Sequence, residues 1–123
     1  MNTPMSIVNE FLDLTNNKHD VAGAVELMAS DIHFVGPVME LNGAQEYKRI
    51  LERFLSVHVG WKKLAEFENR SDACVIAEIY IKTPAGSTIT LKIAEWFIVR
   101  DGKISEHRIY YDPREFMTAF GMQ

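Results

Sequence analysis

The fold is decided by one stretch of the chain, AEWFIVRDGKISEHRIYYDP at residues 94–113. Two runs rich in aromatic and β-branched residues flank Arg100-Asp101-Gly102, and an Asp-Gly pair between such runs is a strong local signal for a β-hairpin. Glu95 and His107 stand in these runs among apolar neighbours. A carboxyl group and an imidazole in such surroundings need hydrogen-bond partners or a hydrated pocket, because burying an unpaired charge is costly. The last two strands are therefore the expected position of a functional site.

Length and composition describe a single ordinary globular domain spanning residues 1–123, with 47% hydrophobic and 24% charged residues. The net charge is −4 and the basic residues are scattered, which argues against nucleic acid or an anionic membrane as a partner. No segment approaches the 18 or so apolar residues of a membrane span, and the start lacks the features of a signal peptide, so we expect a cytoplasmic protein. Cys74 is the only cysteine, which excludes an internal disulfide. No spacing suggests a metal site, and we expect no cofactor.

Helical periodicity dominates the first half of the chain and strand alternation dominates the second. We expect helices at 5–16, 20–28 and 42–55, with a capping box formed by Asn42 and Gln45, and a short strand at 32–35. Strands follow at 61–69, 74–83, 88–99 and 104–111, and Asp112-Pro113 begins a short closing helix that Gly121 ends. Helices followed by a meander of long strands indicate an α+β fold in which the helices cover one face of the sheet.

The order and lengths of these elements resemble the nuclear-transport-factor-2-like superfamily, which includes ketosteroid isomerases, SnoaL-like polyketide cyclases and limonene-epoxide hydrolases. The resemblance extends over essentially the whole chain, and its most specific part is the closing run from Asp101-Gly102 through Tyr111-Asp112 to Phe120-Gly121. It implies a cone of helices packed on a curved, mostly antiparallel sheet, with a largely apolar pocket for a small apolar molecule. Such a scaffold does not by itself determine the chemistry.

Strand register decides which side chains face that pocket, because a shift of one residue turns a whole strand over. A symmetric turn at 84–87 pairs Ile76 with Glu95 and places Glu78 on the same face.

The register of the last hairpin has two possible forms. A three-residue loop at 100–102 pairs Glu95 with His107. A two-residue Asp-Gly turn puts Arg108 beside Glu95 and moves His107 to the other face. We favour the three-residue loop because the position of Ile109 faces the cavity in the resembled superfamily.

This register predicts the composition of both sheet faces. The expected pocket face carries Ile76, Glu78, Tyr80, Leu91, Ile93, Glu95, Phe97, His107, Ile109 and Tyr111. The expected outer face carries Ala77, Ile79, Ile81, Ala94, Trp96, Ile98, Arg108 and Tyr110.

The candidate catalytic residues are Glu95 and His107 as an acid–base pair, with Glu78 as a second carboxylate one diagonal step away. A buried pair of this kind either handles protons or is only a satisfied structural contact, and the residues leave both readings open. The expected ligand-binding residues are hydrogen-bond donors and apolar wall residues. They are Tyr80, Tyr111, Phe11, Phe97, Ile109, Phe34 and Phe54.

Mechanisms known in the resembled superfamily lack most of their residues here. The isomerase general base corresponds to Gly36 of Gly36-Pro37, the helix-borne oxyanion Tyr to Phe11, and only the second oxyanion carboxyl has a counterpart, in Glu95. The hydrolase Arg and two Asp residues fall on Ile76, Glu78 and Ile109, and the cyclases' usual cavity Asp also falls on Ile109. None of these activities is carried over by name.

Two classes of function therefore remain. One is a small enzyme, an isomerase, cyclase or hydrolase, that uses acid–base chemistry on a cyclic or carbonyl-bearing apolar molecule. The other is a non-catalytic module for ligand binding or dimerisation. A water-accessible cavity at Glu95 would favour the enzyme. Aromatic side chains that fill that space would favour the non-catalytic module.

The remaining histidines and the outer face complete the expectations. His33 is expected to face away from the pocket, His58 to be a solvated helix end, and His19 to lie on the surface. No segment is left to cover the apolar outer face, so we expect a homodimer. Its interface would be the sheet face bearing Ile79, Trp96, Ile98 and Tyr110.

Overall fold

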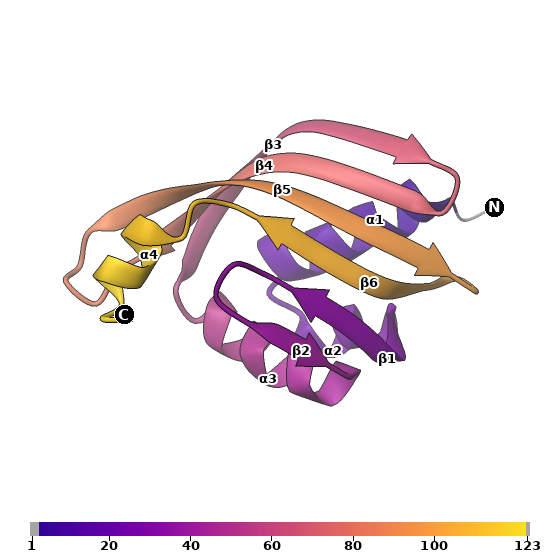
Figure 1. Ribbon diagram of the computed structural model, residues 1–123, viewed down its shortest axis with the longest axis horizontal. Coiled ribbons are helices and arrows are strands. Elements are labelled where there is room, and N and C mark those ends of the chain that lie inside the picture. The colour runs from indigo at the N-terminus through magenta and orange to yellow at the C-terminus, as the bar shows by residue number, and fades with distance from the viewer. Residues whose placement is uncertain (1–2, 123) are drawn as a thin grey trace.

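The computed structural model describes residues 3–122 and has the expected α+β architecture, with a curved sheet wrapped around helices (Figure 1). The helices are α1 (Pro4–Leu12), its π-helical continuation η1 (Asp13–Asn17), α2 (Val21–Glu26), α3 (Ala44–Leu55) and α4 (Arg114–Ala119). The strands are β1 (Met28–Val35), β2 (Glu40–Asn42), β3 (His58–Asn69), β4 (Asp72–Lys82), β5 (Thr88–Arg100) and β6 (Lys103–Tyr110).

The six strands form one sheet in the order β2-β1-β6-β5-β4-β3, in which β1 and β6 pair in parallel and the other neighbouring strands pair antiparallel. Helices α1, α2 and α3 lie on one side of this sheet, and α4 lies at one end of the long strands (Figure 1). Within residues 3–122, no helix is long and apolar enough to cross a membrane.

Local capping explains where the first two helices begin. The Thr3 side chain accepts a hydrogen bond from the Ser6 N–H at 3.1 Å, and Asp20 Oδ1 accepts one from the Gly23 N–H at 2.9 Å. The capping box expected at Asn42 and Gln45 is wrong. Helix α3 begins after Gly43, whose φ of 96° suits glycine, because the short strand β2 runs up to Asn42.

The expected register between β4 and β5 is wrong by one residue. The loop at 83–87 has five residues, closed by a 2.8 Å contact between the Thr83 and Ser87 hydroxyls, so Lys82 pairs with Thr88 and Val75 with Glu95. This shift of one residue exchanges the two faces of β4: side chains expected to face the pocket lie on the outer face, and those expected outside face inward. The inward row of β4 is Val75, Ala77, Ile79 and Ile81, all buried.

The β5–β6 hairpin combines features of both expected forms. Asp101 and Gly102 have φ of 54° and 75°, and Arg100 pairs with Lys103, so the turn has two residues and the favoured three-residue loop is wrong. An irregularity follows at once, because Val99 pairs with Ile104 but Ile98 pairs with Glu106. This bulge leaves Ser105 as the extra residue and returns His107 to the inner face, opposite Phe97.

The main core fills the space between the helices and the inner sheet face. Val8 and Phe11 of α1 and Val75 and Phe97 of the sheet are almost completely buried. The outer face keeps Phe67, Trp96 and Tyr110 exposed. Ile79, expected there with Ala77 and Ile81, points inward instead because β4 is turned over.

His58 also differs from the expectation, because it is buried at the start of β3 rather than solvated at a helix end. Its Nδ1 lies 3.2 Å from Nε2 of His19, and its Nε2 is the only buried side-chain nitrogen or oxygen among the described residues that has no partner. Burial and the nearby His19 ring lower the pKa of His58. By contrast, His33 faces away from the pocket as expected, and the Glu40 carboxylate raises its pKa.

These two shifts predict opposite pH effects on stability. Below about pH 6.5 His58 takes up a proton in the unfolded chain, whereas in the folded protein it stays neutral down to a lower pH. The free energy of unfolding therefore falls as the pH decreases through the folded-state pKa. His33 contributes stability that is present below that pH and is lost as the pH rises through its folded-state pKa. Urea unfolding of H58L should therefore lose less stability than wild type on acidification, and H33Q should lose more. Parallel pH profiles for wild type and H58L would contradict the account of His58.

Candidate functional site

A cavity of about 420 Å³ opens between the inner sheet face and helices α1, α3 and α4. Aliphatic and aromatic side chains form nearly all of its wall, as is usual for small-molecule sites. The expected wall residues that line it are Phe11, Phe34, Phe54, Ile109 and Tyr111. The polar or charged side chains on the wall are Thr15, Asn16, Tyr47, Arg53, Glu95, His107 and Tyr111.

Three polar side chains form a connected chain at one end of this cavity. Glu95 Oε1 lies 2.8 Å from His107 Nε2, and His107 Nδ1 lies 2.6 Å from the Tyr47 hydroxyl. Exposure is only 5% for Glu95, 4% for His107 and 6% for Tyr47. The chain therefore connects β5, β6 and α3 through the interior of the protein.

Aromatic rings hold His107 in one orientation. Phe97 stacks on the imidazole with centroids 4.1 Å apart and planes 12° apart, and Tyr47 stacks at 5.9 Å. Phe34 and Phe11 contact the ring edge-on at 5.2 and 6.0 Å. This enclosure excludes water from the imidazole and leaves it little freedom to rotate.

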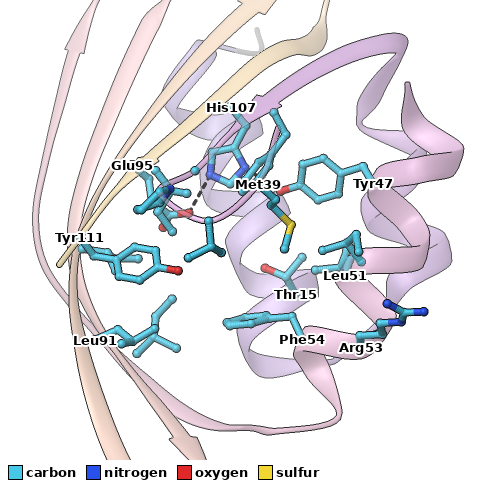
Figure 2. Close-up of a pocket in the computed structure, with 18 of the residues that line it drawn as sticks. Thr15, Met39, Tyr47, Leu51, Arg53, Phe54, Leu91, Glu95, His107 and Tyr111 are labelled. Carbon is cyan, nitrogen blue, oxygen red and sulfur yellow. Dashed lines mark hydrogen bonds and ion pairs between the residues drawn. The ribbon is translucent and has the colours of Figure 1, made fainter. Parts of the chain in front are cut away.

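Two polar groups on the sheet side of the cavity are available to a ligand. Glu95 lines the cavity, and its Oε2 has no hydrogen-bond partner among the described residues and is not completely buried. The Tyr111 hydroxyl points toward the middle of the cavity from the same sheet side (Figure 2). Thr15 offers no such donor, because its hydroxyl already donates to the Phe11 carbonyl at 3.0 Å.

Burial raises the pKa of both cavity tyrosines. The pKa of Tyr47 lies well above its ordinary value, first through burial and then through the Glu95 charge. Burial alone raises the pKa of Tyr111. Both phenols therefore keep their protons around neutral pH and act as hydrogen-bond donors.

The structure brings together Glu95 and His107 but separates them from two other expected site residues. Glu78 and Tyr80 lie on the outer face, where the Tyr80 hydroxyl donates to Glu78 Oε1 at 3.1 Å, because β4 is turned over. Phe97 does not line the cavity, since it lies behind His107. Among the described residues, no three His, Cys, Asp or Glu side chains gather as metal ligands.

Tyr47 is the site residue that sequence reasoning missed. It belongs to the apolar stripe of α3 together with Leu51 and Leu55, all buried. Its partner His107 is 60 residues away in the sequence, so only the packing of α3 against β6 brings the two together. Its hydroxyl within an otherwise apolar stripe was the available signal, because buried tyrosines usually have a hydrogen-bond partner.

The importance of this aromatic enclosure can be measured by truncating one ring. Phe97→Ala removes a fully buried ring that stacks on His107, so urea unfolding should show a loss of about 3–5 kcal/mol. The control variant Val59→Ala truncates a side chain that is 56% exposed and should change stability by less than about 0.5 kcal/mol. Equal losses in the two variants would contradict the position of the core.

Comparisons with known proteins identify the fold and its family. The family model described as SnoaL-like domain matches residues 8–107. No curated protein matches the chain. A nuclear-transport-factor-2-like protein of unknown function from Cytophaga hutchinsonii is 23% identical, with a TM-score of 0.80 over 95% of this chain and 96% of that one.

Two further solved structures share the fold at lower identity. A protein of unknown function from Burkholderia pseudomallei is 15% identical, with a TM-score of 0.85 and 98% of each chain covered. TerC, crystallised with polyporic acid, is 18% identical, with a TM-score of 0.79 over 94% of this chain and 96% of that one.

Proposed function

Because the chain belongs to the SnoaL-like domain family, whose fold encloses a cavity here, we propose that it is a cofactor-free acid–base enzyme acting on a small apolar molecule. The substrate would be cyclic or carbonyl-bearing, and the reaction an isomerisation or cyclisation. Glu95 would act as the base, with His107 as the residue that positions it. Tyr111 would act as the hydrogen-bond donor.

The observation that carries this proposal is the free oxygen of Glu95. Glu95 is 5% exposed and lines a largely apolar cavity, so few water molecules compete with a ligand for its carboxylate. Its other oxygen is held by His107, so its position is defined before any ligand arrives. A purely structural contact would not need to leave one carboxylate oxygen without a partner beside a cavity of this size.

Tyr111 supports the choice of a carbonyl-bearing substrate. Glu95 pairs with Ile109, and Tyr111 follows two residues later, so the two side chains are diagonal neighbours at roughly 7–8 Å. A carbonyl group with an adjacent C–H bond fits between such a donor and such a base. TerC, which shares the fold, was co-crystallised with polyporic acid, which agrees with a small molecule as the ligand on this scaffold.

The proposed reaction begins with proton transfer from carbon to Glu95. The C–H bond next to the carbonyl breaks, its proton goes to Glu95 Oε2, and its electron pair moves onto the carbonyl oxygen. The Tyr111 hydroxyl donates to this enolate oxygen and stabilises its charge. Return of the proton to a different carbon gives an isomer. Alternatively, the enolate carbon attacks a second carbonyl of the same molecule, and the proton goes to the new alkoxide, which gives a ring.

Proton exchange tests the proposal without knowledge of the natural substrate. The protein should accelerate the replacement of the α-hydrogens of 2-tetralone, an apolar cyclic ketone, by deuterium from D₂O, as followed by NMR. Glu95→Gln should slow the exchange by about 100-fold or more, because general acid–base groups contribute rate factors of this order.

Glu78→Gln is the matched control, since Glu78 lies on the outer face. The E78Q variant should accelerate the deuterium exchange of the ketone as much as wild type does. The proposal fails if E95Q is as active as wild type, or if both variants lose the activity equally. The second function, a non-catalytic ligand-binding module, would be favoured by tight binding of the ketone without any exchange.

We also propose a homodimer formed through the outer sheet face. Phe67, Trp96 and Tyr110 are exposed there around a hollow of about 400 Å³. A two-fold contact would bury these rings against the same face of a second copy, and aromatic side chains are frequent anchors of such interfaces. Arg108 lies over the Trp96 ring at 5.9 Å. These features agree with a second copy of the chain as the partner.

Light scattering on two variants tests the dimer. Trp96→Glu places a charge at the centre of the face and should convert a micromolar dimer into a monomer. Gln45→Glu adds the same charge at an exposed position of α3, on the helical side, and should leave the dimer intact. A monomeric wild type would reject the proposal, and a dimeric W96E variant would place the interface elsewhere.

A further inference from the structure

The contact between Tyr47 and His107 has one consistent direction of donation. Two atoms 2.6 Å apart must share one hydrogen, and the buried phenol keeps its proton because its pKa is raised. The other aromatic rings in contact with Tyr47 are Phe11 and Phe34, which offer no acceptor of comparable strength. Among the described residues, His107 Nδ1 is the only hydrogen-bond partner of the Tyr47 hydroxyl, so donation to Nδ1 is the arrangement that gives the buried phenol proton an acceptor.

This direction determines the tautomer of His107. Because Nδ1 accepts a hydrogen bond, it carries no proton, and the ring proton resides on Nε2. Nε2–H then donates to Glu95 Oε1 at 2.8 Å. The imidazole is neutral in this arrangement and both of its nitrogens have a hydrogen-bond partner, while Glu95 Oε2 stays without one.

The charge balance of the cavity follows from the tautomer. The ionisable lining residues, apart from the tyrosines, are Glu95, His107 and Arg53 among those described. Arg53 is exposed on the last turn of α3, and Figure 2 shows it on the helix side, with its guanidinium turned away from Glu95. The interior thus holds one negative charge without a neighbouring cation.

We propose that Tyr47 is a positioning residue that holds His107 as the neutral Nε2–H tautomer, so that the negative cavity takes neutral ligands in preference to carboxylates. The inference rests on the proposed function only in taking Glu95 as the group that meets the ligand. A carboxylate ligand would bring a second negative charge close to Glu95 in a largely apolar space, where repulsion is strong. A neutral ligand with a hydroxyl or an acidic C–H group would instead offer Oε2 a hydrogen.

The tautomer can be read directly by NMR of the imidazole nitrogens in the protein without ligand. Wild type at neutral pH should show a protonated, pyrrole-type Nε2 and an unprotonated, pyridine-type Nδ1 for His107. Tyr47→Phe should change this spectrum, because Nδ1 loses its donor. Tyr111→Phe removes an equivalent hydroxyl from the same cavity without touching His107 and should leave the spectrum unchanged.

Either of two results overturns the tautomer assignment. One is a wild-type His107 with a protonated Nδ1, and the other is a folded Y47F variant with the wild-type pattern. The wild-type spectrum decides the question even if Y47F does not fold. No turnover is involved, so this result is independent of whether the proposed reaction occurs.

Charge selectivity is tested with a pair of probes of similar shape. Titration calorimetry should show that wild type binds 2-naphthol about tenfold or more tightly than 2-naphthoate, as expected for repulsion between two like charges. Glu95→Gln removes the cavity charge and should bring the two affinities close together. Equal affinities in wild type, an unchanged ratio in E95Q, or no binding of 2-naphthol would each contradict the proposed selectivity.

Discussion

The burial of one carboxylate in an apolar interior is the constraint on which the rest of the site depends. Glu95 is 5% exposed, so it needs a strong hydrogen-bond donor to compensate for lost solvation. His107 is that donor, and Tyr47 in turn satisfies the other nitrogen of the imidazole. Each of the three groups lies on a different element, so the correct packing of β5, β6 and α3 is needed to satisfy all of them. A buried polar network of this kind favours one arrangement of the core over its alternatives.

A single extra residue in β6 makes this network possible. The two-residue turn at Asp101-Gly102 suits the twist of the hairpin, but without a correction it would turn His107 outward. The bulge at Ser105 shifts the register by one and restores the inward orientation. The Ser105 hydroxyl donates to the Ile98 carbonyl at 3.1 Å, which holds the bulge in place. Bulges often have this role beside functional sites, where they redirect a side chain.

The sequence allowed the fold class and the hairpin to be predicted, because these depend on local turn signals and on hydrophobic periodicity. The contact between Glu95 and His107 was predicted from a wrong register: the expected loop pairs the two residues directly, whereas Glu95 pairs with Ile109 and the bulge turns His107 inward. The orientation of β4 was not predictable in this way, since both of its alternating rows contain apolar residues and the loop at 83–87 differs from the assumed turn by one residue. Tyr47 and His58 were misjudged for a different reason. Their environments arise from contacts 60 and 39 residues away, which periodicity does not report.

The central claim is that Glu95 and Tyr111 together hold a carbonyl-bearing molecule inside the cavity. A crystal structure of the protein soaked with 2-tetralone tests it most directly. We predict density in the cavity, with the ketone oxygen within hydrogen-bond distance of the Tyr111 hydroxyl and an α-carbon about 3–3.5 Å from Glu95 Oε2. Ketone bound only at the outer sheet face, or a cavity closed by rearranged Phe34 and Phe54, would contradict the account.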